Sequence, residues 1–580
     1  MKTYRIILLS VLLIFVTLSC EDILDRTPLD KINAEDVFAD EILTQAYVTN
    51  LYSRFPFNDF RSQQTTQSDE MTTSTDNRSN VTQGTVSKTS EANALWDYTY
   101  IRDMTDFIDK IRASSLKESV KTQLEGEVRF LRAFVYFEMQ KRYGGVPLVD
   151  MVIDPFVLPI DQKYTKRSTE EEIYNFIDSE LADIIPMLSA TPDPKGRVNR
   201  YTAFALRARA NLWSASIAKF STVQLNGLVG IPASRTNELY TKASVAADSV
   251  ILSGKYSLYN PVPSDKVENY RLIFIDESHS EIIWERVYDG VNIGHGWDAW
   301  NAPNQFAGRG GTWDPTLEFL LGYENVDGSA DEPLFGVDYL YDNGRGPFMK
   351  KDPRLFATVF FEKDAWSGGT VKTYEGIDTS STVPDVSKIV SNVTGSYNGM
   401  EYVGIDSRTQ VKDDFSTNSG FLPKKFTDGR NIQIPDGQSI TNWPLFRLAE
   451  MYLTKAEAEF EMGHLAIAAA ALNPTRQRAG ITLVDETTIT RDLVRTERRS
   501  ELAFENFRYW DLRRWRVSET VLNHRFQGLR IIYHYASGKY YFLPIFCESF
   551  TRTFLAAHYY NPITDSRLNN NPDLIENPLY

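Results

Sequence analysis

The residues of this 580-residue chain that are best suited to chemistry are three tryptophans close together in the sequence. Trp297, Trp300 and Trp313 fall within seventeen residues, in a segment rich in Gly, Asn and Asp without helical periodicity. An indole face packs well against the apolar C–H face of a sugar, and amides or guanidinium groups hydrogen-bond to its hydroxyls. The segment supplies such groups from Asn301, Asn304, Gln305 and Arg309. We therefore predict a glycan-binding platform here, with the alternative that the tryptophans fix a large loop to the core.

No catalytic or metal-binding motif accompanies these residues. His-Glu-x-x-His, Gly-x-Ser-x-Gly, Cys-x-x-Cys and a phosphate loop are all absent, and the six histidines are scattered. Gly294-His295-Gly296 resembles a loose dinucleotide fingerprint, but Pro303 prevents the helix that must follow it. The spacing around Asp327 also fails that of a calcium loop. We expect no cofactor, no metal and no catalytic residue, although glycoside hydrolysis needs only two carboxylates and the chain has 77 acidic residues.

The charge distribution argues against a nucleic-acid partner. The net charge is −15, which repels a polyanion. Seven arginines lie between residues 495 and 516, but Glu497, Glu501, Glu505 and Asp511 are interleaved with them at largely helical spacing. We interpret this segment as an intramolecular network of ion pairs.

Helical periodicity predicts the scaffold that must position these residues. One apolar stripe recurs at steps of four, three, four and four, and glycines followed by a proline end it near residue 144. Its members are Leu124, Val128, Leu131, Val135 and Met139. Similar stripes with alanines at close-approach positions occur at residues 203–217, 240–252 and 445–460. Alanine-rich helices of this kind are typical of stacked helix hairpins.

The predicted fold is mainly α, a degenerate tetratricopeptide-like array of helix hairpins with a large irregular insertion. Gly- and Asp-rich loops separate short strand-like pieces in the insertion, and no linker divides the chain after residue 30. We expect one domain over residues 35–580, in which the repeats occupy about 35–260 and 440–525, the loop-rich ligand-binding part about 261–440, and a C-terminal tail 526–580.

The first residues of the chain are typical of an export signal. Lys2 and Arg5 precede an apolar run of about a dozen residues, too short for a membrane span of roughly 20 residues. The run ends at Thr17-Leu18-Ser19-Cys20, which is typical of a lipoprotein cleavage site. With only Cys20 and Cys547, a disulfide framework is not indicated, and Cys547 is most simply a small buried hydrophobe. We predict a signal peptide over residues 1–19 and a lipidated tether over 20–34, the alternative being an ordinary signal peptide that ends in cysteine.

One long motif covers residues 126–149 and reads GEVRFLRAFVYFEMQKRYGGVPLV. This motif resembles the SusD/RagB family of surface nutrient-binding lipoproteins. A departure from the family pattern is Pro474, which we expect to be tolerated if Asn473 caps and Pro474 opens a new helix. Further segments typical of the family occur in the family's order at residues 20–25, 351–355, 446–463, 476–480, 495–515, 571–572 and 577–580.

The resemblance implies a SusD-like fold and a non-catalytic lipoprotein anchored to the cell outer membrane. Glu21-Asp22 resembles the acidic signal that sends such lipoproteins to the exterior. There the protein would capture oligosaccharides or polysaccharide fragments and deliver them to a partner SusC-like TonB-dependent transporter. A peptide-binding lid of a RagAB-like oligopeptide importer, a lipid-anchored glycosidase and a ligand-free scaffold are the alternatives.

The resemblance also implies a second group of site residues, because the family's ligand region tends to draw on the loop that precedes the long motif. Here that loop, residues 69–93 and called the early loop below, is a polar stretch without periodicity, and Trp96 follows it. Asp76 and Asn77 within the loop could supply polar contacts to a sugar. Trp96, Asp76 and Asn77 therefore join the predicted glycan-binding residues.

Overall fold

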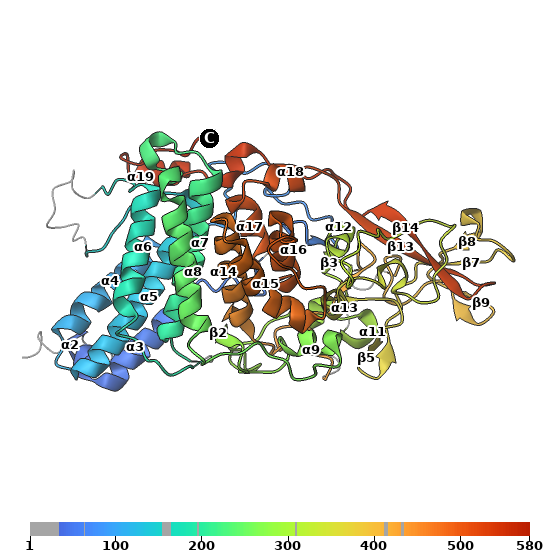
Figure 1. The fold of residues 1–580 in the computed structure, drawn as a ribbon, viewed down its shortest axis with the longest axis horizontal. Coiled ribbons are helices and arrows are strands. Elements are labelled where there is room, and N and C mark those ends of the chain that lie inside the picture. The colour runs from blue at the N-terminus through green and yellow to red at the C-terminus, as the bar shows by residue number, and fades with distance from the viewer. Residues whose placement is uncertain are drawn as a thin grey trace, which may run out of the picture.

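The computed structural model describes residues 34–62, 64–152, 164–193, 196–307, 310–410, 416–430 and 434–580. The molecule is elongated, with long helices at one end and loops and short strands that taper away at the other (Figure 1). The C-terminal segment returns to the helical end beside α19 (Asp565–Asn570). This architecture confirms the predicted mainly α class with a loop-rich insertion.

The helical half is a continuous stack of helices. Consecutive helices pack against one another from α4 to α8, and α8 then packs directly against α14, which contacts α15 and α16. The stack therefore continues across the long excursion that separates α8 from α14 in sequence. The first set comprises α2 (Ala34–Ala39), α3 (Glu41–Ser53), α4 (Tyr98–Ala113), α5 (Glu118–Tyr143), α6 (Glu170–Ile184), α7 (Arg200–Phe220) and α8 (Thr236–Ile251), and the second α14 (Leu448–Glu461), α15 (Leu465–Ala479), α16 (Arg491–Glu501), α17 (Arg508–Arg514) and α18 (Ser518–Leu522).

The first predicted stripe folds as α5, the longest helix of the stack. All five of its members are buried, and α5 packs between α4 and α6. The helix ends at Gly144, whose φ of 72° favours glycine. A Cβ at Gly144 would lie 2.8 Å from the Leu228 carbonyl oxygen, so the close approach of this neighbouring loop also requires glycine.

Pro474 corrects one expectation from the sequence. α15 runs through Pro474, so the proline opens no new helix. Asn473 is not a cap, because its side chain donates to the Val484 carbonyl at 2.8 Å and accepts from the Val484 amide at 3.0 Å. Packing of α15 against α14 and α16 outweighs the local cost of a proline inside the helix.

The other half consists of loops, short helices and small sheets. Its largest described sheet has the strand order β14-β13-β7-β8, in which β13 is parallel to β7 and the other pairs are antiparallel. Its helices are α9 (Lys266–Leu272), α10 (Trp297–Asn301), α11 (Asn304–Ala307), α12 (Leu317–Leu321) and α13 (Pro353–Thr358). Its strands are β1 (Met71–Thr73), β2 (Ile282–Arg286), β3 (Trp313–Pro315), β4 (Val359–Phe360), β5 (Ala365–Trp366), β6 (Gly369–Thr370), β7 (Gly376–Asp378), β8 (Ile389–Val390), β9 (Ser396–Tyr397), β10 (Met400–Glu401), β11 (Leu422–Pro423), β12 (Trp443–Arg447), β13 (Gln527–His534) and β14 (Lys539–Phe546).

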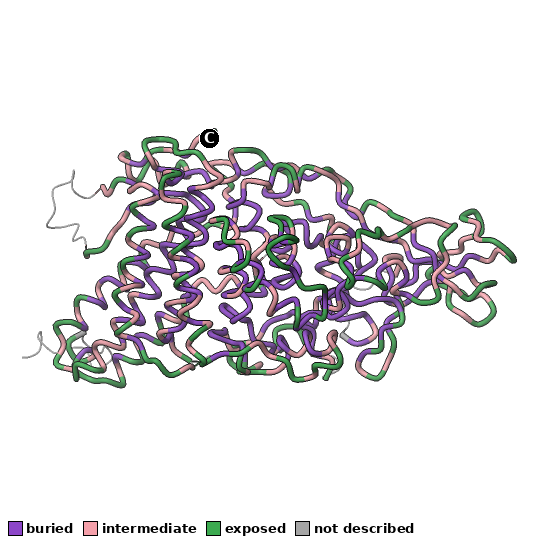
Figure 2. The backbone as a smooth tube through the Cα atoms, viewed as in Figure 1, coloured by how far each residue is buried: buried purple, intermediate pink, exposed green. Residues whose placement is uncertain are grey.

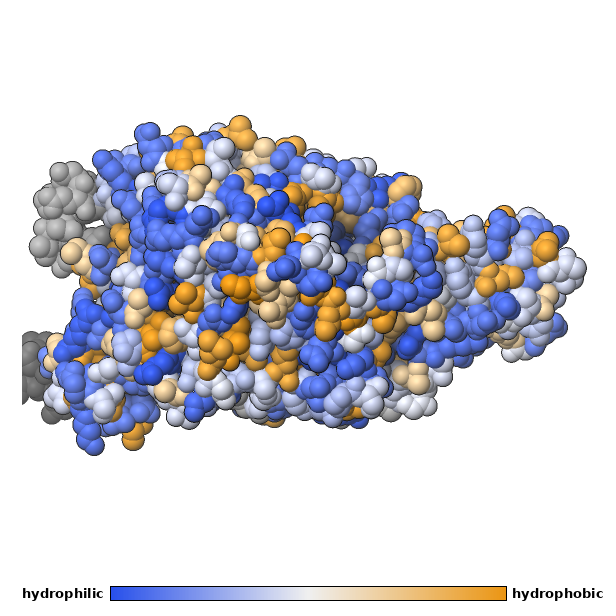
Figure 3. Space-filling model, viewed as in Figure 1, coloured by the Kyte–Doolittle hydropathy of each residue, from blue (hydrophilic) through white to orange (hydrophobic). Residues whose placement is uncertain are grey.

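The surface mixes polar and apolar residues. Figure 3 shows one face as a mosaic of hydrophilic residues with scattered hydrophobic ones. Within the described ranges, no helix combines the length and apolarity needed to cross a membrane. Buried backbone runs through the helical stack and on into the junction with the loop-rich half (Figure 2).

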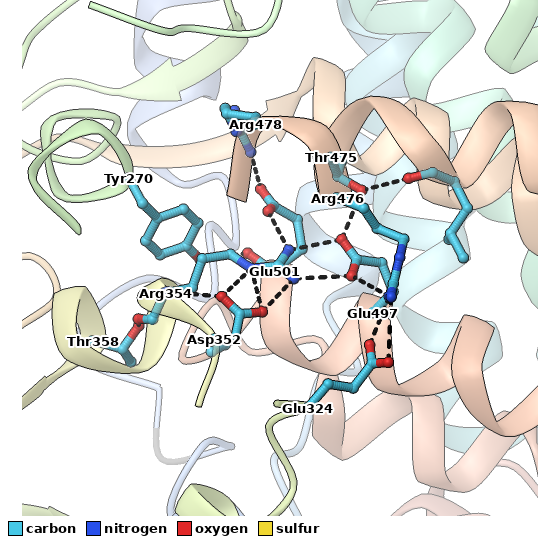
Figure 4. Close-up of polar contacts among 12 residues, drawn as sticks. Tyr270, Glu324, Asp352, Arg354, Thr358, Thr475, Arg476, Arg478, Glu497 and Glu501 are labelled. Carbon is cyan, nitrogen blue, oxygen red and sulfur yellow. Dashed lines mark hydrogen bonds and ion pairs between the residues drawn. The ribbon is translucent and has the colours of Figure 1, made fainter. Parts of the chain in front are cut away.

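A set of buried ion pairs, called the ionic seam below, joins the two halves (Figure 4). Arg354 in α13 donates to Glu497 at 2.7 Å and to Glu501 at 2.9 Å, both in α16. Arg447 at the end of β12 donates to Glu501 at 2.6 Å and to Glu505 at 2.8 Å. The seam consists of Glu281, Asp352, Arg354, Lys425, Arg447, Arg476, Arg478, Glu497, Glu501 and Glu505, all of them buried.

The seam confirms that the acidic residues between 495 and 516 form intramolecular ion pairs. Asp511 pairs within that segment, with Arg498 and Arg514 at 2.8 Å each. Glu497, Glu501 and Glu505 instead take their partners from outside it, from α13, α15, β12 and the chain after β11. The pairs therefore hold the loop-rich half against the C-terminal helices.

Candidate functional site

Two loop segments that hold most of the predicted site residues lie side by side. β1 pairs antiparallel with β3, with Thr73 opposite Trp313. The Ser74 amide extends this contact by donating to the Thr312 carbonyl at 3.1 Å. Asp76 and the other predicted residues of the early loop therefore lie next to the tryptophan segment, although more than two hundred residues separate them in sequence.

Two of the three tryptophans are core residues. Trp297 is 2% exposed, and its indole N–H donates to the Lys425 carbonyl at 3.1 Å. Trp313 is 8% exposed, and its ring centroid lies 5.3 Å from that of Trp297 in an edge-on arrangement. Neither ring presents a face to a ligand, so the prediction of a platform is wrong for these two residues. The alternative holds for them, because burying large aromatic surface fixes the loop to the core.

The remaining residues of the tryptophan segment divide between core and surface. Asn301 is fully buried, and its side-chain oxygen accepts from the Trp313 amide at 3.1 Å, so its predicted role in binding is wrong as well. Trp300 is half-buried, and its ring packs over Gly296. Trp300 stays a predicted binding residue. Arg309 lies outside the described residues.

Trp96 lies apart from the other predicted residues, in the helical half. It lines a cavity of about 450 Å³ together with Tyr98 and Met151. The Arg567 guanidinium lies 4.6 Å from the Trp96 ring centroid, and Tyr143 contacts the ring edge-on. Trp96 remains a prediction, and its cavity is separate from the paired β1 and β3 segments.

A cleft of about 370 Å³ opens where the early loop meets the end of β14, and it is called the β14 cleft below. The cleft is lined by the early loop, by the chain before β11 and by the open end of the β13–β14 hairpin. At that open end lie the residues just before β13 and at the end of β14. Its lining combines hydroxyl, amide, carboxylate and guanidinium groups with one aromatic ring. The lining residues are Ser74, Thr75, Asp76, Arg408, Asn418, Arg525, Phe546, Cys547, Glu548 and Ser549.

Asp76 fixes the early loop to the end of β14. Its carboxylate accepts from the Ser549 amide at 2.5 Å, from the Ser549 hydroxyl and from Arg78 Nε at 2.9 Å. Burial opposes ionisation of Asp76, but these hydrogen bonds outweigh it and lower the pKa of the carboxyl below its ordinary value. Asp76 also adopts a φ of 67°, which is uncommon outside glycine. The predicted residue thus lies in the cleft wall with both oxygens already engaged.

Asn77 stabilises the early loop next to the cleft. The residue is buried, and its side-chain amide donates to the Thr66 carbonyl at 2.6 Å. Its backbone amide donates to the Thr73 hydroxyl at 2.9 Å. Asn77 is therefore a structural residue of the loop, and its predicted direct contact with a ligand is wrong.

An aromatic ring and two arginines form the accessible part of the cleft. Phe546 is 51% exposed at the end of β14. The Arg525 guanidinium lies 4.3 Å from the Phe546 ring centroid, and its Nε donates to the Glu548 carbonyl at 2.5 Å. Arg408 is anchored by donation to Glu375 at 3.0 Å and to the Asn418 carbonyl at 3.0 Å. A flat apolar face and forked donors are thus held in place.

Two buried carboxyl groups belong to this region, Glu548 in the lining of the cleft and Asp314 next to Asn418. Glu548 accepts from Arg552 at 2.9 Å and from the Thr72 hydroxyl at 2.7 Å. One oxygen of Asp314 accepts from the Asn418 backbone amide at 2.8 Å, while its other oxygen has no partner among the described residues. Burial raises the pKa of Asp314 well above its ordinary value and so favours the neutral form of this carboxyl group.

Sequence reasoning missed Phe546, Arg525 and Arg408. Phe546 ends an apolar stretch, and residues 543–546 are all apolar, so the sequence contains no alternation that marks the exposed positions seen in the structure. Cys547, the next residue, is buried as predicted, and burial raises the pKa of its thiol. No group of three or more His, Cys, Asp or Glu side chains in the described ranges is placed to hold a metal ion.

Comparison with known proteins identifies the family. A sequence profile described as the SusD family matches residues 280–580, more than half of the chain. A second profile, described as "Starch-binding associating with outer membrane", matches residues 22–212. The chain belongs to the SusD family.

Individual relatives cover most of the chain at low identity. The chain is 25% identical over 513 residues to starch-binding protein SusD of Bacteroides thetaiotaomicron, covering 83% of this chain and 78% of that protein. It is 23% identical to SusD-like protein P38 of Formosa agariphila, covering 90% of this chain and 94% of that protein. The crystal structure of a SusD-like protein from Bacteroides fragilis superposes with a TM-score of 0.73 at 26% identity, covering 96% of this chain and all of that chain.

Proposed function

We propose that this protein is a non-catalytic glycan-binding protein whose ligand occupies the β14 cleft. The observation that carries the proposal is the exposed Phe546 ring beside donors that the fold holds in place, Arg525 and Arg408. Such a ring packs against the C–H face of a sugar, and preset donors bind its hydroxyls without a large cost of ordering. The relatives of this chain include a starch-binding protein, which supports a glycan as the class of ligand.

Binding to a panel of polysaccharides and oligosaccharides, measured by affinity electrophoresis and calorimetry, tests this proposal. We expect the protein to bind at least one glycan, and Phe546→Ala to weaken that binding about tenfold, the loss of one aromatic packing interaction. Tyr339→Ala serves as the control, because Tyr339 is an exposed aromatic residue that does not line the cleft.

The same panel separates the alternatives. Binding of oligopeptides without any glycan would favour a peptide-binding lid. New reducing ends after prolonged incubation would establish a glycosidase. Unchanged glycan affinity of Phe546→Ala would place the site elsewhere, with the Trp96 cavity and the half-buried Trp300 as the next positions to test.

We further propose that the protein is held on the outer face of the outer membrane by lipid on Cys20 and delivers its ligand to a SusC-like transporter. The cleavage-site pattern and the family support this. A single acyl chain binds membranes only marginally, so a stable anchor needs several chains, as bacterial lipoproteins carry. Cys20→Ala should release the protein from the cell surface, as measured by surface labelling of intact cells and by co-purification with the transporter. Unchanged surface retention would contradict a lipid anchor at Cys20.

A further inference from the structure

The charges around the β14 cleft differ in sign from those of the protein as a whole. The chain carries a net charge of −15. The charged residues that line the cleft, together with all residues that ion pairs connect to them directly or through a shared partner, are five arginines and three carboxylates. They are Arg78, Arg408, Arg525, Arg530 and Arg552 with Asp76, Glu375 and Glu548. The cleft and its ion-pair networks together therefore carry a local excess of two positive charges on an acidic protein.

Each of the three carboxylates is already neutralised by an arginine. Asp76 accepts from Arg78, and Glu548 accepts from Arg552. Glu375 is shared, since one oxygen accepts from Arg408 and the other from Arg530, at 3.0 Å each. One carboxylate thus serves two guanidinium groups, which leaves one positive charge at this position without a counter-ion.

Arg525 supplies the second uncompensated charge. Its Nε is engaged by the Glu548 carbonyl, and the guanidinium lies over the Phe546 ring. No carboxylate among the described residues forms an ion pair with it, and its two Nη groups donate to no described acceptor. Stacking on the ring and the bond through Nε hold the guanidinium, and the two Nη groups form a fork that matches a carboxylate or a sulfate group.

Two further acidic groups near the cleft do not reverse this balance. Burial raises the pKa of Asp314 well above its ordinary value and favours its neutral form. Both carboxylate oxygens of Glu318 accept from the Gln527 backbone amide, at 3.0 and 3.1 Å. The carboxylate also lies 3.7 Å from the His524 imidazole. With Glu318 counted, four carboxylates still face five arginines.

We propose that the β14 cleft selects an anionic glycan, one that carries uronic acid carboxylates or sulfate esters. The inference rests on the proposed function and adds the chemical class of the ligand. The Phe546 ring packs against the sugar face, and Arg525 forms a bidentate pair with the acidic group of the same or the next sugar. The local positive charge also steers a negatively charged chain towards a cleft on an otherwise repelling surface.

Calorimetry with matched oligosaccharides tests the inference. The probes are an oligogalacturonate, the same oligosaccharide with its carboxyls reduced to alcohols, and a sulfated galactan oligosaccharide. We expect one of the two anionic probes to bind about tenfold more tightly than the reduced probe, because a bidentate pair with a charged acceptor is stronger than hydrogen bonds to a neutral hydroxyl. This preference should weaken between about 0.05 M and about 0.5 M NaCl.

Variants assign the preference to a residue. Arg525→Gln should lose most of the tenfold preference, because it should weaken binding of the anionic probe far more than binding of the reduced probe. Arg112→Gln is the matched control, since Arg112 is an exposed arginine on α4 in the helical half, and its affinities should not change.

Three outcomes would overturn parts of the proposal. Equal or tighter binding of the reduced probe would overturn the anionic class and leave glycan binding intact. Binding of none of the probes, nor of any glycan in the wider panel, would overturn the proposed function itself. A salt-sensitive preference that Arg525→Gln does not reduce would overturn the role of Arg525.

Discussion

The ionic seam and the β14 cleft are built from the same residue types but differ in how completely the charges are paired. In the seam, Arg447 is 2% exposed and donates to Glu281, Glu501 and Glu505. In the cleft, Arg525 is half-buried and has no carboxylate partner among the described residues. The arginine side chains of the two regions therefore differ in solvent access, one fully buried and the other half-buried.

Burial explains this difference. A charge removed from water costs several kcal/mol unless opposite charges and hydrogen bonds replace its hydration, so arginines in the seam must be fully paired. At the cleft, water solvates the open side of the guanidinium, and incomplete pairing costs little. The seam can therefore serve only structure, while the cleft keeps donors free for a ligand.

Removing one arginine from the seam should have the largest effect on stability. Arg447→Met leaves Glu501 and Glu505 buried with too few partners, although Arg354, Arg478 and Lys425 remain near them. We expect a loss of about 3–5 kcal/mol in the free energy of unfolding, the usual cost of breaking a buried ion pair from one side. Urea denaturation followed by circular dichroism measures it.

Arg525→Gln provides the comparison from the cleft. We expect its free energy of unfolding to stay within about 0.5 kcal/mol of that of the wild type, because a partly exposed side chain without an ion pair contributes little to stability. Equal losses of free energy of unfolding in Arg447→Met and Arg525→Gln would show that burial does not explain the difference in charge pairing between the two regions.

The seam also shows how far sequence reasoning reaches. The helical spacing of Glu497, Glu501 and Glu505 among arginines was enough to predict ion pairs instead of a nucleic-acid surface. It did not identify the partners Arg354 and Arg447, because these are brought to α16 by the tertiary fold. Local spacing predicts that a charge needs a partner, but only the packing of the loop-rich half determines which one.

The cleft was harder to predict for the same reason. Trp297 and Trp313 have the residue type of a sugar platform, but residue type does not reveal whether a ring lies in the core or at the surface. Phe546 and Arg525 become neighbours through the β13–β14 hairpin, and Asp76 joins them because its carboxylate bonds to Ser549, just after β14. The periodic helices were predictable from sequence, whereas a site assembled from irregular loops was not.

Glu70 lies between the two regions and gives a smaller, pH-dependent test. The residue is buried just before β1, and one of its oxygens accepts from the Phe504 amide at 3.3 Å while the other has no described partner. Burial, with the neighbouring charge of Asp69, raises the pKa of Glu70 to about 8. The unfolded chain ionises near 4.5, so folding retains a proton that the unfolded chain releases. The contribution of Glu70 to stability therefore decreases as pH rises from about 4.5 to about 8.

Glu70→Gln removes this titration and should stabilise the protein at alkaline pH. We expect the free energy of unfolding of the variant to exceed that of the wild type by more than about 1 kcal/mol at pH 9, with a much smaller difference at pH 5. Urea denaturation at the two pH values measures both, and Glu519→Gln, at an exposed position, is the control that should show no pH-dependent difference. If Glu70→Gln lowered stability equally at both pH values, Glu70 would be an ionised partner of Arg499 and Arg508, and full pairing of buried charge would extend from the seam to the base of the cleft.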